Sequence, residues 1–216
     1  MITLKNRQDA GQQLAEKLKK YEHQNPLILG IPRGGVVVAY EIARAVKAEL
    51  GVMITRKIGA PGNPEYAIGA IAPENIVIWN AEALSYFNLD EPTKTKLIAK
   101  EQKEMERRQN IFGGKIDLPK KVKNRVVILV DDGLATGLTA LAATRALRKM
   151  EPKRLVLAFG VCAIDSANNL TKEADELICI SIPSNLSSVG EWYEDFSETM
   201  DQEVLDLLAK NKKEII

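Results

Sequence analysis

Residues 126–139, VVILVDDGLATGLT, carry the strongest structural signal in the chain. Five apolar residues, 126–130, run directly into two acids, Asp131 and Asp132. An unbroken apolar run of this kind is typical of a strand buried on both faces of a parallel sheet. Unpaired carboxylates are strongly disfavoured inside a core. We therefore expect both acids at the carboxyl edge of the sheet, where open α/β folds bind their ligands.

A loop of small residues follows the acids and leads into a helical pattern over residues 140–149. Gly133 and Gly137 permit close approach of the backbone, and Thr136 and Thr139 offer hydroxyl donors. The helix that follows points free N–H groups and a partial positive charge back at the loop. The loop therefore predicts a phosphate site. Because acids repel phosphate, the implied ligand is a sugar phosphate whose diol meets the acids.

This stretch resembles the signature of the type I phosphoribosyltransferases, in which an apolar strand and two acids precede a loop of the form Ala-Thr-Gly-x-Thr. The residues that match are Asp131, Asp132, Ala135, Thr136, Gly137, Leu138 and Thr139. Gly133 departs from the family, which usually has an aliphatic residue there. The resemblance implies an α/β fold with a parallel sheet flanked by helices. It also implies phosphoribosyl diphosphate as substrate and Mg²⁺ held through the substrate diphosphate, with no protein ligand to the metal.

A second strand-loop-helix unit is expected where an apolar strand over residues 27–31 runs into Pro32-Arg33-Gly34-Gly35 and a helix over residues 36–48. The glycines let backbone N–H groups reach a ligand, and Arg33 can pair with phosphate in a bidentate way. A plain tight turn is the alternative. The family resemblance implies that Arg33 and Gly34 contact the pyrophosphate group.

Two cations, Arg56 and Lys57, follow a short strand expected over residues 52–55. Residues 58–66 are rich in Gly and Pro and lack an apolar period, so we expect a long exposed loop. The resemblance implies a mobile loop that closes over the active site, with Arg56 and Lys57 as the basic residues before it. A solvated pair ahead of a passive loop is the alternative.

The resemblance covers roughly residues 26–182 of a single domain, 1–216. The family's hood over the base is expected from the N-terminal helix, from residues 183–196, or from both. Aromatic residues in the second segment either stack on a base or anchor the tail to the core; they are Trp192, Tyr193 and Phe196. Other expected elements are helices over 7–22, 93–110, 166–174 and 199–210, strands over 155–162 and 176–182, and a hairpin of 67–72 with 76–79.

Composition narrows the function classes. The formal net charge is +1, and residues 93–110 mix both signs at helical spacing, so no nucleic-acid partner is expected. Cys162 and Cys179 lie in apolar runs and are expected as free core thiols rather than a disulfide or a metal site. With no secretory pattern and no apolar run near the ~20 residues of a membrane span, we expect a cytoplasmic protein that binds no membrane. A homodimer is expected.

The implied reaction transfers the phosphoribosyl group to a small nitrogenous acceptor and releases pyrophosphate. In this scheme Asp131 and Asp132 hold the ribose diol, residues 135–139 hold the 5-phosphate, and Arg33, Lys57 and Mg²⁺ take the diphosphate charge. A regulator that binds phosphoribosyl diphosphate or a nucleotide without turning it over is the alternative.

The acceptor is expected to be a nucleobase other than a 6-oxopurine, with adenine, a pyrimidine and an acceptor outside nucleotide salvage as the open alternatives. Relatives that act on 6-oxopurines typically carry an acid at the position of Ala135, and alanine has no group that accepts a proton. Glu65 is the one loop acid that could take such a role, and a solvated surface acid is the alternative.

Overall fold

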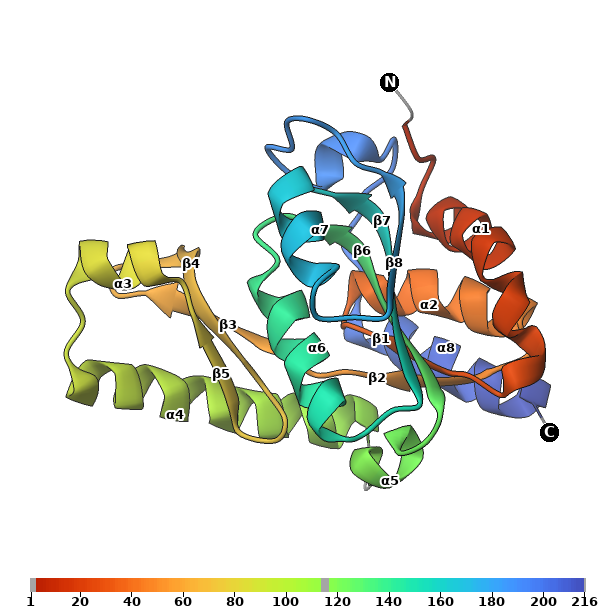
Figure 1. Cartoon of the computed structure of the whole chain (residues 1–216), viewed down its shortest axis with the longest axis horizontal. Helices are drawn as coiled ribbons and strands as arrows, with labels where there is room; N and C mark the ends of the chain where they lie inside the picture. Colours follow the sequence, from red (N-terminus) through yellow and green to blue (C-terminus); the bar gives the residue numbers. More distant parts are fainter. Residues whose placement is uncertain (1–2, 114–116, 216) are drawn as a thin grey trace.

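A computed structural model describes residues 3–113 and 117–215. Its centre is a five-stranded sheet with the strand order β2-β1-β6-β7-β8 (Figure 1). Every pairing between these strands is parallel, which confirms the predicted α/β fold. The strands are β1 (Leu27–Gly30), β2 (Glu49–Val52), β6 (Val126–Leu134), β7 (Arg154–Cys162) and β8 (Glu176–Ser181).

Helices cover both faces of this sheet because side chains alternate along each strand. In β6, Ile128 and Val130 join the core on one face, whereas Val127 and Leu129 join the core on the other. The first face is covered by α1 (Arg7–Leu18), α2 (Gly34–Ala45) and α8 (Asp201–Ile215). The second is covered by α5 (Leu118–Val122), α6 (Leu138–Lys149) and α7 (Ile164–Leu170). Burial on both faces accounts for the unbroken apolar run of β6.

An appended antiparallel sheet replaces the long loop expected over residues 58–66, so that expectation was wrong. Its strands are β3 (Arg56–Ala60), β4 (Asn63–Ala72) and β5 (Ile76–Trp79), and it forms the lobe on the left of Figure 1 with α3 (Ala81–Phe87) and α4 (Glu91–Arg108). Ile58 and Ala60 are buried, whereas Pro61 and Gly62 form the turn between β3 and β4. The Gly and Pro residues therefore belong to a turn and to an irregular ladder that shifts register beside Gly59.

The appended sheet packs on both of its faces. Ala70 and Ala72 of β4 join the core formed with α6, whereas Ile71 joins a third core with α3 and α4. The β4–β5 hairpin was predicted and is confirmed. The preceding strand, β2, ends at Val52 rather than reaching residue 55.

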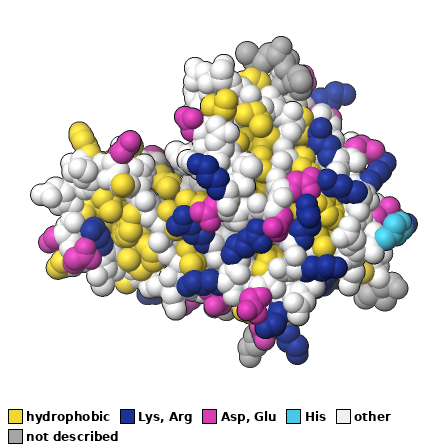
Figure 2. Space-filling view, in the orientation of Figure 1, with side chains coloured by type: hydrophobic (Ala, Val, Ile, Leu, Met, Phe, Trp, Pro, Cys, Tyr) yellow, Lys and Arg dark blue, Asp and Glu magenta, His cyan; other side chains and the backbone are white. Residues whose placement is uncertain are grey.

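Most expected helices are present with shifted ends. Helix α1 ends at Leu18 and continues as the 3₁₀ turn η1 (Lys19–Gln24), and α4 continues as the π turn η2 (Gln109–Gly113). A further 3₁₀ turn, η3 (Gly190–Trp192), precedes α8. Figure 2 shows Lys and Arg side chains intermixed with Asp and Glu over the face in view. Among helices of the described residues, none has the length and apolarity to cross a membrane.

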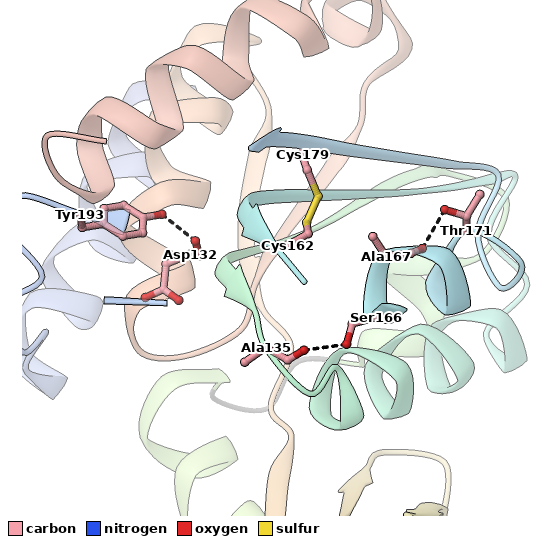
Figure 3. The surroundings of a disulfide bond; sticks show 8 residues. All are labelled: Asp132, Ala135, Cys162, Ser166, Ala167, Thr171, Cys179 and Tyr193. Atoms are coloured by element: carbon pink, nitrogen blue, oxygen red, sulfur yellow. Dashed lines mark hydrogen bonds between the residues drawn. A yellow bond between two sulfur atoms is a disulfide. The ribbon is translucent and has the colours of Figure 1, made fainter. Parts of the chain in front are cut away.

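Cys162 of β7 and Cys179 of β8 form a disulfide, which corrects the expectation of free thiols (Figure 3). The two strands are parallel neighbours. The Cα atoms of Cys162 and Cys179 are 6.4 Å apart, within the range that a disulfide spans. The number and spacing of the cysteines do not show which strands become neighbours, so this disulfide could not be predicted from the sequence.

The N-terminal segment and the segment before α8 meet at the carboxyl edge of the main sheet, beside Gly160 of β7. Leu4 forms a parallel bridge with Tyr193. The Leu4 N–H donates to the Trp192 carbonyl at 2.9 Å, and the Glu194 N–H donates to the Leu4 carbonyl at 2.8 Å. The N-terminal segment and the segment before α8 are therefore joined to each other.

Candidate active site

The carboxyl ends of β1 and β6 bring together the two predicted strand-loop-helix units. Strand β1 ends at Gly30, the Pro32–Arg33 peptide bond is cis, and α2 begins at Gly34. A side chain at Gly34 would collide with the Asp132 carboxylate, and one at Gly35 would collide with Asp131. Glycine at both positions therefore lets the N-terminus of α2 lie directly against the acid pair.

Asp131 and Asp132 lie near the carboxyl end of β6 and are partly buried. The Arg7 Nε donates to the Asp132 Oδ2 at 2.7 Å, and these two side chains are 11% and 16% exposed. The Asp132 N–H donates to the Asp131 Oδ1 at 2.9 Å. The acids occupy the predicted edge of the sheet, but a cation from α1 compensates their burial.

Burial also perturbs the protonation of this cluster. Desolvation raises the pKa of Asp131 well above its ordinary value, and the negative charge of Asp132 adds to the shift. Desolvation likewise raises the pKa of Asp132, whereas the hydrogen bond and charge of Arg7 lower it. Burial and the two neighbouring acids raise the pKa of Tyr193. The acid pair therefore resists carrying two negative charges, and Arg7 supports the charge on Asp132.

The segment before α8 docks on the strand ends through two glycines. The Tyr193 hydroxyl donates to the Asp132 carbonyl at 2.6 Å (Figure 3), and a side chain at Gly160 of β7 would occupy the place of that hydroxyl. A side chain at Gly133 would collide with Val189. The departure from the family pattern at Gly133 thus makes room for Val189.

The predicted phosphate loop lies in different surroundings. Ala135 and Thr136 are exposed, and Gly137, at φ +73°, provides the left-handed residue from which α6 starts. The Ser166 Oγ of α7 donates to the Ala135 carbonyl at 2.6 Å (Figure 3). Leu138 and Thr139 form the first turn of α6. The loop is open, fixed in shape and placed at the N-terminus of a twelve-residue helix.

Arg33 lies beside the acid pair and is already paired with two acids. Its guanidinium forms ion pairs with Glu198 and with Asp201, the latter at 3.7 Å. Arg7 donates to the Ser197 carbonyl at 2.6 Å. An open cavity of about 360 Å³ is lined by Arg7, Arg33, Gly34, Phe196, Glu198 and Thr199. A ligand that binds Arg33 must therefore displace carboxylates of the chain itself.

Arg56 and Lys57 are not brought to this cluster. The Arg56 Nε pairs with Glu101 of α4 at 3.1 Å, and the Lys57 Nζ pairs with Glu65 of β4 at 3.2 Å. Within residues 3–113 and 117–215, neither Arg56 nor Lys57 forms a hydrogen bond or an ion pair with Arg33, Asp131 or Asp132. Their ion pairs belong to the appended lobe.

Tyr193 was singled out from the sequence, and its buried ring and hydroxyl anchor the segment before α8 to the core, which is one of the two expected alternatives. Sequence patterns missed three further residues near the site: Arg7, Glu198 and Asp201. One signal was available for Arg7, because a cation in the first turn of a helix is opposed by the helix dipole and indicates a specific acidic partner. The other two lie in segments without a repeating pattern, and only the fold shows that they reach the site.

Comparison with known proteins defines the class to which this fold and site belong. Residues 3–197 match the model of the phosphoribosyl transferase domain, so the chain belongs to the phosphoribosyltransferase family. It is 35% identical over 206 residues to a Mycobacterium tuberculosis protein, provisionally named a phosphoribosyl transferase, in strains CDC 1551 and H37Rv. That match covers 95% of this chain and 46% of the relative, so the chain spans about half the length of the curated relatives it matches.

Two solved structures show the same fold. The crystal structure of TT1426 from Thermus thermophilus is 36% identical, with a TM-score of 0.69 over 96% of this chain and 98% of that one. The AQ2163 protein of Aquifex aeolicus is 15% identical, with a TM-score of 0.52 over 85% of this chain and 78% of that one. At this lower identity the likeness shows the fold alone.

Proposed function

We propose that this chain transfers the 5-phosphoribosyl group of phosphoribosyl diphosphate to a small nitrogenous acceptor and releases pyrophosphate. One observation carries the proposal. This chain belongs to the family, and three groups lie at the carboxyl ends of its adjacent parallel strands β1 and β6. They are the acid pair, the N-terminus of α2 with Arg33, and the loop over residues 135–139. These are the three groups that a sugar diphosphate requires.

Phosphoribosyl transfer requires the protein to position the substrate, and it requires no nucleophile from the protein. As the bond from the anomeric carbon to the diphosphate lengthens, that carbon becomes cationic. Asp131 and Asp132 accept hydrogen bonds from the ribose hydroxyls, and the open loop with the first turn of α6 receives the 5-phosphate. Holding the ribose, neutralising the leaving group and excluding water then account for the rate enhancement.

The diphosphate lies at the N-terminus of α2 in this scheme. Arg33 exchanges Glu198 and Asp201 for the diphosphate oxygens, because charge-assisted bidentate pairing favours phosphate over two surface carboxylates. Mg²⁺ prefers oxygen ligands, and when bound it neutralises part of the diphosphate charge. The described residues offer no cluster of three or more His, Cys, Asp or Glu, so the diphosphate itself would supply ligands to the ion.

Lys57 and Arg56 take a smaller part. Lys57 reaches the leaving group only after it releases Glu65, and Arg56 only after it releases Glu101. A movement of the β3–β4 hairpin, rather than closure of an irregular loop, would bring them to the substrate. Glu65 is 92% exposed and paired with Lys57, so a proton-accepting role needs the same movement.

The acceptor is a base other than a 6-oxopurine. The Ala135 side chain is a methyl group, whereas a 6-oxopurine would need a proton-accepting acid at this position. The Ala135 carbonyl already accepts a hydrogen bond from the Ser166 hydroxyl. Hypoxanthine and guanine are therefore expected to be poor acceptors.

A ligand-sensing regulator is the second candidate, favoured by the ion pairs of Arg33. Glu198 and Asp201 precede or begin α8, so a diphosphate that displaces them would change the contacts of the C-terminal helix. Such a coupling needs no turnover.

Pyrophosphate release separates the two candidates. The protein is mixed with phosphoribosyl diphosphate, Mg²⁺ and each base of a panel, while calorimetry measures binding of the diphosphate alone. Release that depends on one base supports the transferase, and binding without release under every base supports the regulator. Absence of binding would contradict both.

A further inference from the structure

Arg7 is held from several sides at the edge of the site. Its Nε donates to the Asp132 Oδ2 at 2.7 Å, and its Nη1 donates to the Ser197 carbonyl at 2.6 Å. The guanidinium carbon lies 3.8 Å from the centre of the Phe196 ring. The side chain is 11% exposed. An arginine immobilised in this way presents one fixed hydrogen-bond donor to the acid.

Docking of the N-terminal segment does not depend on this ion pair. Leu4 already exchanges two backbone hydrogen bonds with Trp192 and Glu194. The Asn6 side chain caps α1 by accepting from the Asp9 N–H at 2.9 Å. The N-terminal segment therefore has contacts of its own besides those that Arg7 makes with Ser197 and Phe196.

Gly34, the first residue of α2, lies where α1, α2 and β6 pack closely together. A side chain there would collide with both the Asp132 carboxylate and the Arg7 guanidinium. Arg7 and the N-terminus of α2 thus pack closely against the Asp132 carboxylate, and its Oδ2 accepts the hydrogen bond from Arg7.

We propose that Arg7 is a positioning residue of the phosphoribosyl site. Its hydrogen-bonded ion pair holds the Asp132 carboxylate in place, so that this group and Asp131 accept the hydrogen bonds of a ribose diol. The inference rests on the proposed function, since it assigns the acid pair to the ribose. In this proposal Arg7 acts through Asp132.

The charged surroundings predict a pH signature. The titratable groups facing Asp132 are Asp131 from β6, Arg7 from α1 and Tyr193 from the segment before α8, with Asp9 near the tyrosine. Among these groups Arg7 is the cation, and it lowers the pKa of Asp132 against the effect of burial. Loss of Arg7 should raise that pKa further, so that a larger share of the acid is protonated at a given pH.

Calorimetric titration with phosphoribosyl diphosphate and Mg²⁺, from about pH 6 to about pH 9, tests the proposal. Arg7→Gln should bind about tenfold more weakly than wild type near pH 7, and the deficit should shrink as pH rises. Arg7→Lys should recover part of the affinity, because it restores the charge but not the fixed geometry. Arg44→Gln, which breaks the ion pair with Glu41 on α2, is the matched control and should match wild type.

Several outcomes would overturn the proposal. One is Arg7→Gln affinity equal to wild type; another is a deficit that stays constant with pH and is not relieved by lysine, which indicates a merely structural arginine. Tighter binding would show that Arg7 competes with the ligand. If Arg7→Gln does not fold, the pH profile of Arg7→Lys against wild type decides. Wild-type protein that binds no phosphoribosyl diphosphate contradicts the proposed function itself, a result distinct from all of these.

Discussion

The acid pair and the loop over residues 135–139 are neighbours in the chain, yet they lie in opposite surroundings. Asp131 and Asp132 are shielded, and their charge is balanced by Arg7 from the N-terminal helix. The loop is open, and what holds it is local: Gly137 at the start of α6 and the hydrogen bond from Ser166. The diol half of the site therefore depends on both ends of the chain, whereas the phosphate half depends on β6, α6 and α7.

The largest expected difference between the halves is in stability. Asp132→Asn leaves the Arg7 guanidinium without its charged partner in a position only 11% exposed. Breaking a buried pair from one side costs about 3–5 kcal/mol, so we expect a loss near the low end, about 3 kcal/mol, in the free energy of unfolding. Thr136→Ala, on the exposed loop, should change it by less than about 0.5 kcal/mol. Equal losses by denaturant unfolding would remove the distinction.

The loop half has one distant support, the Cys162–Cys179 disulfide. Residue 163 follows Cys162, and its N–H donates to the Leu134 carbonyl just before the loop. The cysteines are 17 residues apart, and closing a loop of this size contributes about 3 kcal/mol to stability. The double variant Cys162→Ala and Cys179→Ala should lose about this amount against oxidised wild type. A reductant that leaves the wild-type unfolding midpoint in place would show that the bond contributes nothing.

The two halves should also differ in their dependence on pH. The pKa of Asp131 is raised in the folded state, so its proton stabilises the fold at low pH, and this contribution is lost as pH rises from the unfolded value, about 4, through the folded value. Asp131→Asn removes that loss and should gain on wild type by up to about 1.4 kcal/mol per pH unit in this window. Thr136→Ala should run parallel to wild type. A parallel course for Asp131→Asn as well would contradict the burial of the acids.

The smallest effect expected concerns Gly137. A side chain there meets a left-handed backbone, φ +73°, and the Ser166 side chain at 3.2 Å. Gly137→Ala should lose about 1–2 kcal/mol in stability and also weaken phosphate binding. Gly62→Ala is the control for the backbone cost, because Gly62 has φ +77° with open space around it and lies in the β3–β4 turn rather than in the loop over residues 135–139. Its backbone cost should be similar, with no change in affinity; weakened binding in both variants would argue against a specific role of the loop.

The sequence predicted the parts of the molecule that depend on local patterns. The apolar run of residues 126–130 predicted a doubly buried parallel strand, and the family signature placed the acids and the loop at its end. The β3–β4 hairpin was missed because buried residues in β3 are few, Ile58 and Ala60, while the Gly and Pro of its turn dominate the pattern.

What the sequence could not predict depends on contacts between distant segments. Arg7 and Asp132 are 125 residues apart, and Arg33 and Glu198 are 165 apart. The disulfide likewise required knowledge that β7 and β8 are neighbours. Such pairs carry no spacing rule, because the fold alone decides which chain ends cover the carboxyl edge of the sheet.

In the proposed site, the acids hold a ribose diol while the loop holds the phosphate. Calorimetry with ribose 5-phosphate and 2-deoxyribose 5-phosphate tests this claim, with wild type, Asp132→Asn and Thr136→Ala. Wild type should prefer the ribose ligand by about tenfold, because the deoxy sugar leaves a buried carboxylate without its hydroxyl donor. Asp132→Asn should lose this preference, and Thr136→Ala should weaken both ligands equally while keeping it. Equal affinity of wild type for the two sugars, or a preference that persists in Asp132→Asn, would contradict the claim.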